Sequence, residues 1–207
     1  HLYVSQSNGA DAREVFASDR MIPVFLYWAP DSSGLAFLAT QTDGNSGILR
    51  LSKLDGAESQ VLDSGQPLFW AWSPSGKRML IHSNGARRNS RLAYLLLGDS
   101  IIEEGLSVIA APFQAPTFSP DGAQIMFAGI TDEGESALIT LDRTSNRQQV
   151  LAAYQGTVTF QWSPPGDHIA FAPSHDTALT TNGPLTIMTM QTPPRQLVAI
   201  GQNIVGF

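Results

Sequence analysis

The sequence contains no cysteine among its 207 residues, which excludes a disulfide framework, a thiolate nucleophile and a thiolate metal site. Only 14% of the residues are charged and the formal net charge is −6, so the chain has no large basic field. Binding to nucleic acids, which depends on such a field, is therefore disfavoured. No apolar run is long enough to span a membrane, since the longest, LAYLLL at 92–97, is far too short.

The sequence also lacks the common catalytic signatures. It has no Gly-x-Ser-x-Gly nucleophile elbow, no His-Glu-x-x-His, no P-loop and no dinucleotide fingerprint. Glu103 and Glu104 are paired carboxylates, but we expect them in a polar turn, where neighbouring carboxylates are usually solvated. No signal peptide is visible at the start of this sequence, and its absence does not decide the compartment.

What the sequence does contain is a repeat. Four times an aromatic residue is followed, two positions later, by a proline and a tight turn. The prolines are separated by 44, 46 and 44 residues, and the four aromatic–proline pairs are Trp28 and Pro30, Trp72 and Pro74, Phe118 and Pro120, Trp162 and Pro164. A fixed period in this range indicates a repeat architecture, in which one unit cannot bury its own apolar surface.

The clearest copy of the turn is Phe118-Ser119-Pro120-Asp121-Gly122. Proline presets the backbone for the second position of a type I turn, Asp suits the third position, and Gly122 tolerates a left-handed fourth position. Gly166 has the same place in the last copy. A turn of this kind joins two antiparallel strands. Ser32, Ser75 and Pro165 depart from the pattern, which favours altered turns in those three copies.

Each period encodes four short strands, as in one blade of a β-propeller. Around Pro74, for example, PLFWAW and KRMLIH are apolar runs rich in branched and aromatic residues, and a polar turn and RLAYLLL follow. We predict an all-β propeller of four-stranded antiparallel blades, of which the chain covers about 4.7. The expected single, partial domain spans 1–207, with a half blade at 1–20, blades at 21–64, 65–110, 111–154 and 155–201, and a first strand at 202–207.

The repeat resembles that of the TolB-like (WD40-like) propeller family. The residues that carry the resemblance are the four aromatic–proline turns and the second strands that follow them, such as Ile125-Met126-Phe127 and Ile169-Ala170-Phe171. The resemblance implies a six-bladed ring in a bacterial periplasmic or otherwise extracytoplasmic protein that binds other proteins without a cofactor. The alternative architecture is a five-bladed ring that the strand ending at Phe207 closes by pairing with the N-terminal strands.

Glutamines recur in the connections between blades, on the face that forms the mouth of the channel. Each precedes a first strand by a few residues, and the series consists of Gln66, Gln114, Gln155 and Gln202. A ring of amide donors and acceptors could bind the backbone of a partner or an inserted peptide. The alternative interpretation is that these amides only hold the loops in place.

A second candidate is a basic cluster in the connection between the second and third strands of one blade. It consists of His82, Arg87, Arg88 and Arg91. Arginines so close together in an acidic protein could bind an acidic partner or a carboxylate. The alternative is a solvated hairpin tip that complements the acidic tip of the next blade, Asp132, Glu133 and Glu135.

The histidines do not predict a metal site. His168 is expected near the start of a second strand and His175 beyond its end, so the length of the strand separates them. His175 and Asp176 lie on the same face as His82, but two blades away from it. We therefore expect no metal and no cofactor.

Three functions fit the sequence. The first is a non-enzymatic scaffold that binds a protein or peptide partner through the channel-mouth face. The second is the substrate-gating propeller of a prolyl-oligopeptidase-type hydrolase, whose catalytic domain would lie outside this sequence. The third is a metal-dependent enzyme similar to oligogalacturonate lyase, since the same repeat occurs in that family.

Overall fold

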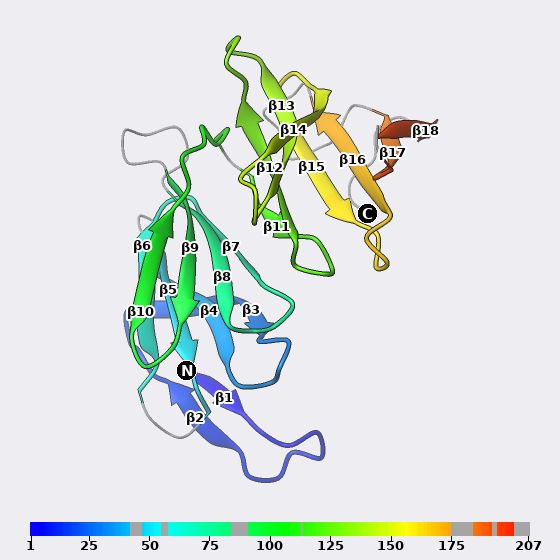
Figure 1. Cartoon of the computed structure of the whole chain (residues 1–207). Coiled ribbons are helices and arrows are strands. Elements are labelled where there is room, and N and C mark those ends of the chain that lie inside the picture. Colours follow the sequence, from blue (N-terminus) through cyan, green and yellow to red (C-terminus); the bar gives the residue numbers. More distant parts are fainter. Residues whose placement is uncertain are drawn as a thin grey trace.

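The structure is a computed structural model that describes residues 1–41, 47–54, 58–83, 91–112, 114–174, 184–191 and 194–200. These residues form 18 β-strands and no helix (Figure 1). No helix of the described residues could therefore cross a membrane. The predicted first strand at 202–207 lies outside the described residues, as does Gln202.

The strands form four antiparallel sheets of four strands and one smaller pair. The N-terminal pair consists of β1 (Leu2–Val4) and β2 (Arg13–Phe16). Sheet 1 comprises β3 (Met21–Trp28), β4 (Leu35–Gln41), β5 (Gly47–Ser52) and β6 (Gln60–Gly65). Sheet 2 comprises β7 (Leu68–Trp72), β8 (Arg78–Ser83), β9 (Arg91–Leu97) and β10 (Ile101–Gly105). Sheet 3 comprises β11 (Thr117–Phe118), β12 (Gln124–Ile130), β13 (Ser136–Asp142) and β14 (Gln148–Ala153). Sheet 4 comprises β15 (Thr157–Trp162), β16 (His168–Ser174), β17 (Leu185–Thr189) and β18 (Arg195–Ile200).

In every sheet the strands pair in the order of the sequence. Figure 1 shows that β3 and β7 lie on the side of their sheets that faces β11, whereas β6 and β10 lie at the far left and β18 at the far right. In sheets 1, 2 and 4 the first strand is therefore the inner strand and the fourth strand the outer one. β11 also lies beside β7 of the preceding sheet.

The middle strands are buried on both faces because each sheet is covered by its neighbours. In β12 the five central residues, Ile125 to Gly129, are all buried, and the run is apolar throughout. The buried side chains form four clusters, and each cluster joins two successive units. Ile81 and Leu38, for example, belong to a cluster shared by sheets 1 and 2, whereas Phe127 and Leu80 belong to one shared by sheets 2 and 3.

All four aromatic–proline turns have the same backbone hydrogen bond, so the expectation of altered turns was wrong. The residue before each proline accepts a bond from the fourth turn residue at 2.8 or 2.9 Å, including Ser32 in the first copy and Gly166 in the last. Ser32 takes the left-handed conformation that Gly122 has, with φ values of 60° and 71°. Pro165 is accommodated without loss of the bond.

The position of the paired carboxylates was also predicted incorrectly. Glu103 and Glu104 lie in β10, where they pair with Leu95 and Tyr94 of β9, and not in a turn. Glutamate and glycine have low strand propensity, which hid this strand in the sequence. Both side chains are exposed on this outer strand.

Candidate functional site

The path of each sheet assigns the connections to two faces. The first strand of each sheet ends at an aromatic–proline turn, and the second strand runs back in the opposite direction. The turns between second and third strands therefore lie at the end of the sheet where the first strand began. The connections between sheets lie at that same end. We call this the channel-mouth face. The aromatic–proline turns lie at the opposite end of the sheets.

Gln114, predicted on the channel-mouth face, is buried and has a structural contact. Its side-chain Oε1 accepts a hydrogen bond from the Ala128 N–H at 3.2 Å, and only 3% of the residue is exposed. Its backbone carbonyl accepts a bond from His82 Nδ1 at 3.0 Å. The amide thus connects the loop before β11 to sheet 3, as in the alternative interpretation of the glutamine series.

His82 does not lie in the predicted basic loop. It belongs to β8, is fully buried, and stacks against the ring of Phe69 with the centroids 6.2 Å apart. Burial lowers its pKa, although the hydrogen bond to the Gln114 carbonyl acts in the opposite direction. A carbonyl can only accept, so the proton of the neutral ring is on Nδ1, and the buried Nε2 has no hydrogen-bond partner among the described residues.

Arg91 is already paired. It begins β9, and its guanidinium forms ion pairs with Asp63 of β6 at 2.6 Å and with Glu103 of β10 at 3.0 Å. These contacts connect sheets 1 and 2 and leave Arg91 poorly suited to capture a partner. Arg87 and Arg88 lie outside the described residues.

Gln155 lies where the glutamine series was expected to act. It is exposed and lines a cleft of about 660 Å³ between sheets 3 and 4, together with Glu135, Tyr154 and Pro173. Burial raises the pKa of Tyr154 to about 12, although a hydrogen bond with Ser136 acts against this shift. The phenol therefore stays protonated and can both donate and accept. Gln66 is exposed as well.

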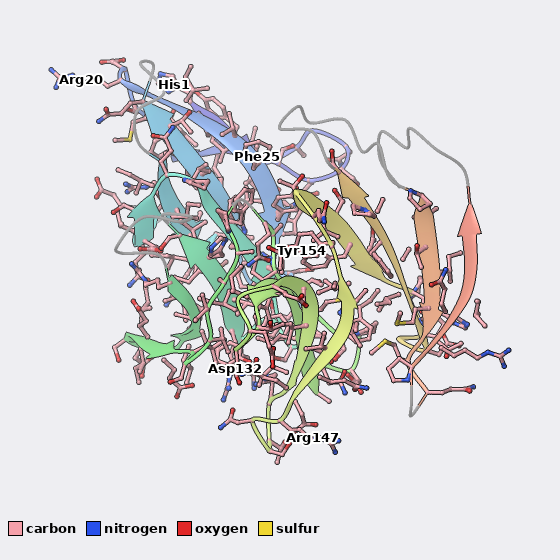
Figure 2. All side chains as sticks on the ribbon, turned by 90° about the horizontal axis from the view of Figure 1, so that it is seen from above. His1, Arg20, Phe25, Asp132, Arg147 and Tyr154 are labelled. Carbon is pink, nitrogen blue, oxygen red and sulfur yellow. The ribbon has the colours of Figure 1, made fainter. Side chains whose placement is uncertain are left out.

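An aromatic surface on the inner strand β3 was not predicted from the sequence. Four consecutive residues are exposed, Phe25 by 64%, Leu26 by 44%, Tyr27 by 54% and Trp28 by 52%, and we call them the β3 aromatic surface. Tyr27 makes an edge contact with Trp70 of β7, with a centroid distance of 5.6 Å, and its carbonyl accepts a hydrogen bond from the indole of Trp72. Figure 2 places Phe25 and Tyr154 near the middle of the molecule, whereas Arg20 and Arg147 are at its edges.

The same stretch of β3 contains a bulge. Val24 pairs with Leu38 and Tyr27 pairs with Ala36, so Phe25 and Leu26 together face one residue of β4. Phe25 has a φ of 51°, in the left-handed region that a bulky side chain rarely adopts. Such strained positions tend to occur where a protein binds a ligand or partner. The run FLYW was the available sequence signal, but it also fits a buried strand.

The described residues contain no group of three His, Asp or Glu side chains that could hold a metal. His168 lies at the start of β16, and its Nδ1 is 2.8 Å from Asp167. His175 and Asp176 are outside the described residues.

Two curated relatives match parts of the chain. Lipoprotein LpqB of Bifidobacterium longum is 24% identical over 51% of this chain, and Tol-Pal system protein TolB of Alcanivorax borkumensis is 29% identical over 31%. The chain spans only 20% and 15% of the lengths of these relatives. No family model matches the sequence.

Solved structures match nearly the whole chain. A TolB-related structure from Agrobacterium tumefaciens aligns with a TM-score of 0.58 and 16% identity, covering 93% of this chain and 86% of that one. The chain folds as a β-propeller. The predicted resemblance to TolB-like propellers is thus confirmed at the level of fold.

Propellers of proteases align equally well. The propeller domain of the trilobed protease from Pyrococcus furiosus gives a TM-score of 0.57 at 11% identity, covering 90% of this chain and 59% of that one. A prolyl endopeptidase structure gives 0.60 at 12% identity, covering 95% of this chain and 32% of that one. The propeller fold is therefore shared with TolB-related structures and with propellers of proteases.

Proposed function

We propose that the chain is a non-enzymatic propeller scaffold that binds a peptide segment of a protein partner. The observation that carries this proposal is the β3 aromatic surface, four consecutive exposed apolar residues on an inner strand. Monomeric proteins seldom expose such a patch unless it binds something. Aromatic side chains provide large contact area with little loss of conformational freedom, which suits them to interfaces.

The channel-mouth face offers a second, polar contact for the partner. Gln66 and Gln155 are exposed there, and the cleft beside Tyr154 offers a hydroxyl and an amide to the backbone of a peptide. Arg87 and Arg88 stay part of the proposal as a second contact for an acidic partner. An extracytoplasmic location is also proposed, by resemblance to TolB-like proteins, and activity of an alkaline phosphatase fusion to the full reading frame would test it.

Peptides selected from a displayed library on the purified chain would test the binding function. We expect them to bind with a Kd on the order of 1–100 μM and to lose at least tenfold in affinity when Phe25 and Trp28 are both replaced by Ser. Leu197→Ser is the matched control, because Leu197 is 49% exposed on the outer strand β18. Equal binding by the double variant and the control would reject this site, and Arg87→Glu with Arg88→Glu would test the loop separately.

The second candidate is a substrate-gating propeller of a prolyl-oligopeptidase-type hydrolase. The similarity of 95% of this chain to part of a prolyl endopeptidase structure favours it. The complete reading frame separates the two candidates. A downstream Gly-x-Ser-x-Gly within an α/β domain would support the hydrolase, and a frame without such a domain would support the scaffold.

A further inference from the structure

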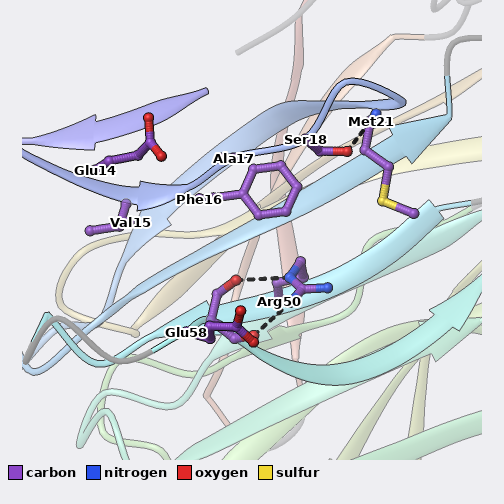
Figure 3. A pocket seen from close by; sticks show the side chains of 9 residues that line it. Glu14, Val15, Phe16, Ala17, Ser18, Met21, Arg50 and Glu58 are labelled. Atoms are coloured by element: carbon purple, nitrogen blue, oxygen red, sulfur yellow. Dashed lines mark hydrogen bonds between the residues drawn. The ribbon is translucent and has the colours of Figure 1, made fainter.

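A cleft of about 390 Å³ lies between the N-terminal pair and sheet 1. Its apolar wall comes from Val15, Phe16 and Met21, and its floor carries Arg50 of β5. Figure 3 shows the ring of Phe16 standing over the guanidinium, with the side chain of Met21 beside it. None of the residues of the β3 aromatic surface lines this cleft, and it shares no residue with the channel-mouth cleft at Tyr154.

Arg50 is held in a fixed orientation. Its Nε donates to Ser59 Oγ at 2.8 Å and its Nη2 to the Ser59 carbonyl at 2.6 Å. The guanidinium lies 5.3 Å from the centroid of Phe16, and Phe16 in turn packs edge-on against Phe37 at 5.1 Å. An immobilised guanidinium loses little entropy when it binds an anion.

The charge of Arg50 is not neutralised by any described residue. Two carboxylates line the same cleft, Glu14 and Glu58, yet neither forms an ion pair with Arg50. Glu14 instead contacts His1 Nδ1 at 2.7 Å. Ser59 uses two of the five guanidinium N–H donors, which leaves three for another acceptor.

The fold does not require an arginine at this point of a sheet. Arg50 pairs with Phe37, and Phe37 lies seven residues after the turn proline Pro30. The residues at the same register in sheets 2, 3 and 4 are Ala93, Ile139 and Thr186. All three are uncharged and buried. Arginine is therefore a departure from the repeat, specific to the sheet that borders this cleft.

We propose that the cleft binds a small monocarboxylate with an apolar body. The free N–H donors of Arg50 would hold the carboxylate in a planar, two-point contact, the geometry in which arginine binds carboxylates best. The apolar body would lie against Val15, Phe16 and Met21. The two glutamates lower the local positive potential, which selects a single negative charge over a doubly charged phosphate.

Titration of the purified chain with 4-methylpentanoate, followed by NMR or calorimetry, tests the site. We expect saturable binding with a Kd on the order of 1 mM, as for a fragment of this size. The uncharged isostere 4-methylpentanamide and inorganic phosphate should each bind at least tenfold more weakly. Equal binding of acid and amide would overturn the proposal, because the cleft would then recognise only the apolar body.

Two variants locate the binding to Arg50. Arg50→Gln should lose at least tenfold in affinity for 4-methylpentanoate, whereas Arg147→Gln, on an exposed turn far from the cleft, should leave the Kd unchanged. Glu58→Gln removes a negative charge that repels the carboxylate of the ligand, and it removes no described hydrogen bond. This variant should therefore bind 4-methylpentanoate about two- to fivefold more tightly. Unchanged affinity in Arg50→Gln would reject the site. If that variant fails to fold, the absence of tightening in Glu58→Gln would reject it as well.

Discussion

The aromatic residue two positions before each turn proline has the same place in the repeat, but its burial differs from one copy to the next. Trp162 and Phe118 are 8% and 6% exposed, whereas Trp28 is 52% exposed. Trp28 pairs with Leu35 in the same register in which Phe118 pairs with Ile125 and Trp162 with Ile169, so pairing within the sheet does not explain the difference. At the scale of a residue, the repeat predicts the turn and not the burial of the aromatic side chain.

His82 shows the same limit for a polar residue. In the sequence it stands beside a basic loop and is a plausible surface contact. In the structure it is the last but one residue of β8, fully buried under the loop that contains Gln114, and it donates to that residue's carbonyl. The burial of His82 depends on how the loop that contains Gln114 packs on β8, and a local sequence pattern does not predict that packing.

We predict that His82 makes the protein less stable in mild acid. Burial lowers its pKa in the folded state, so as the pH falls below the usual value of about 6.5 the unfolded chain takes up a proton before the folded chain does. The contribution is therefore complete above about pH 6.5 and is lost as the pH falls toward the folded-state pKa. Urea unfolding at pH 7.5 and 5.5 should show this loss.

His82→Gln is the comparison variant. It should be less stable than the wild type at pH 7.5, because the ring packing against Phe69 is lost, but its free energy of unfolding should fall less between pH 7.5 and 5.5. The same decrease in both proteins would show that His82 is not the group responsible.

At the scale of elements, the turns of neighbouring sheets pack on one another. A Cβ built on Gly122 would lie 3.3 Å from Pro74 Cδ, and one on Gly166 would lie 3.2 Å from Pro120 Cδ. Two reasons therefore favour glycine at these positions. Each has a positive φ, and the proline of the preceding turn leaves little room for a Cβ. The sequence predicts the first reason but not the second, because the second depends on how sheets stack.

The side chain of Arg143 connects sheets 2 and 3. Its guanidinium lies 5.4 Å from the ring centroid of Tyr94 in β9 and 5.5 Å from that of Phe118 in β11, and its Nη1 donates to the Gly122 carbonyl. One cation thus contacts aromatic rings of sheets 2 and 3. Such contacts contribute about 0.5–2 kcal/mol when partly desolvated.

We predict that Arg143→Lys lowers the free energy of unfolding by about 1 kcal/mol, because an ammonium cannot stack on both rings while it donates to Gly122. The midpoint of urea unfolding measures this. Arg147→Lys, four positions along on the exposed turn, should change stability by less than about 0.5 kcal/mol. An equal effect of the two substitutions would rule out a specific role for Arg143.

At the scale of the whole molecule, stability comes from the interfaces between sheets. The cluster that contains Phe127 and Ile139 of sheet 3 also contains Leu80 and Leu92 of sheet 2. Neither sheet buries these side chains alone. Damage to one sheet should therefore spread to the next, as in other repeat proteins.

We predict that Phe127→Ala, at a fully buried position, costs about 3–5 kcal/mol. Hydrogen exchange should accelerate in β8 of sheet 2 as well as in β12. Leu197→Ala, at an exposed position of β18, should leave both strands protected. Faster exchange confined to sheet 3 would contradict the shared-core description.

The sequence by itself determined the all-β propeller, its period and its turns, because these depend on local backbone preferences that recur every 44 to 46 residues. The sequence did not determine which polar side chains are exposed and which make structural contacts. Gln114 and Arg91 are occupied by structural contacts, whereas Gln155 is exposed beside a cleft. The tertiary structure alone decided that the β3 aromatic surface is exposed and that Arg50 has no ion-pair partner among the described residues, because both depend on contacts between strands far apart in the sequence.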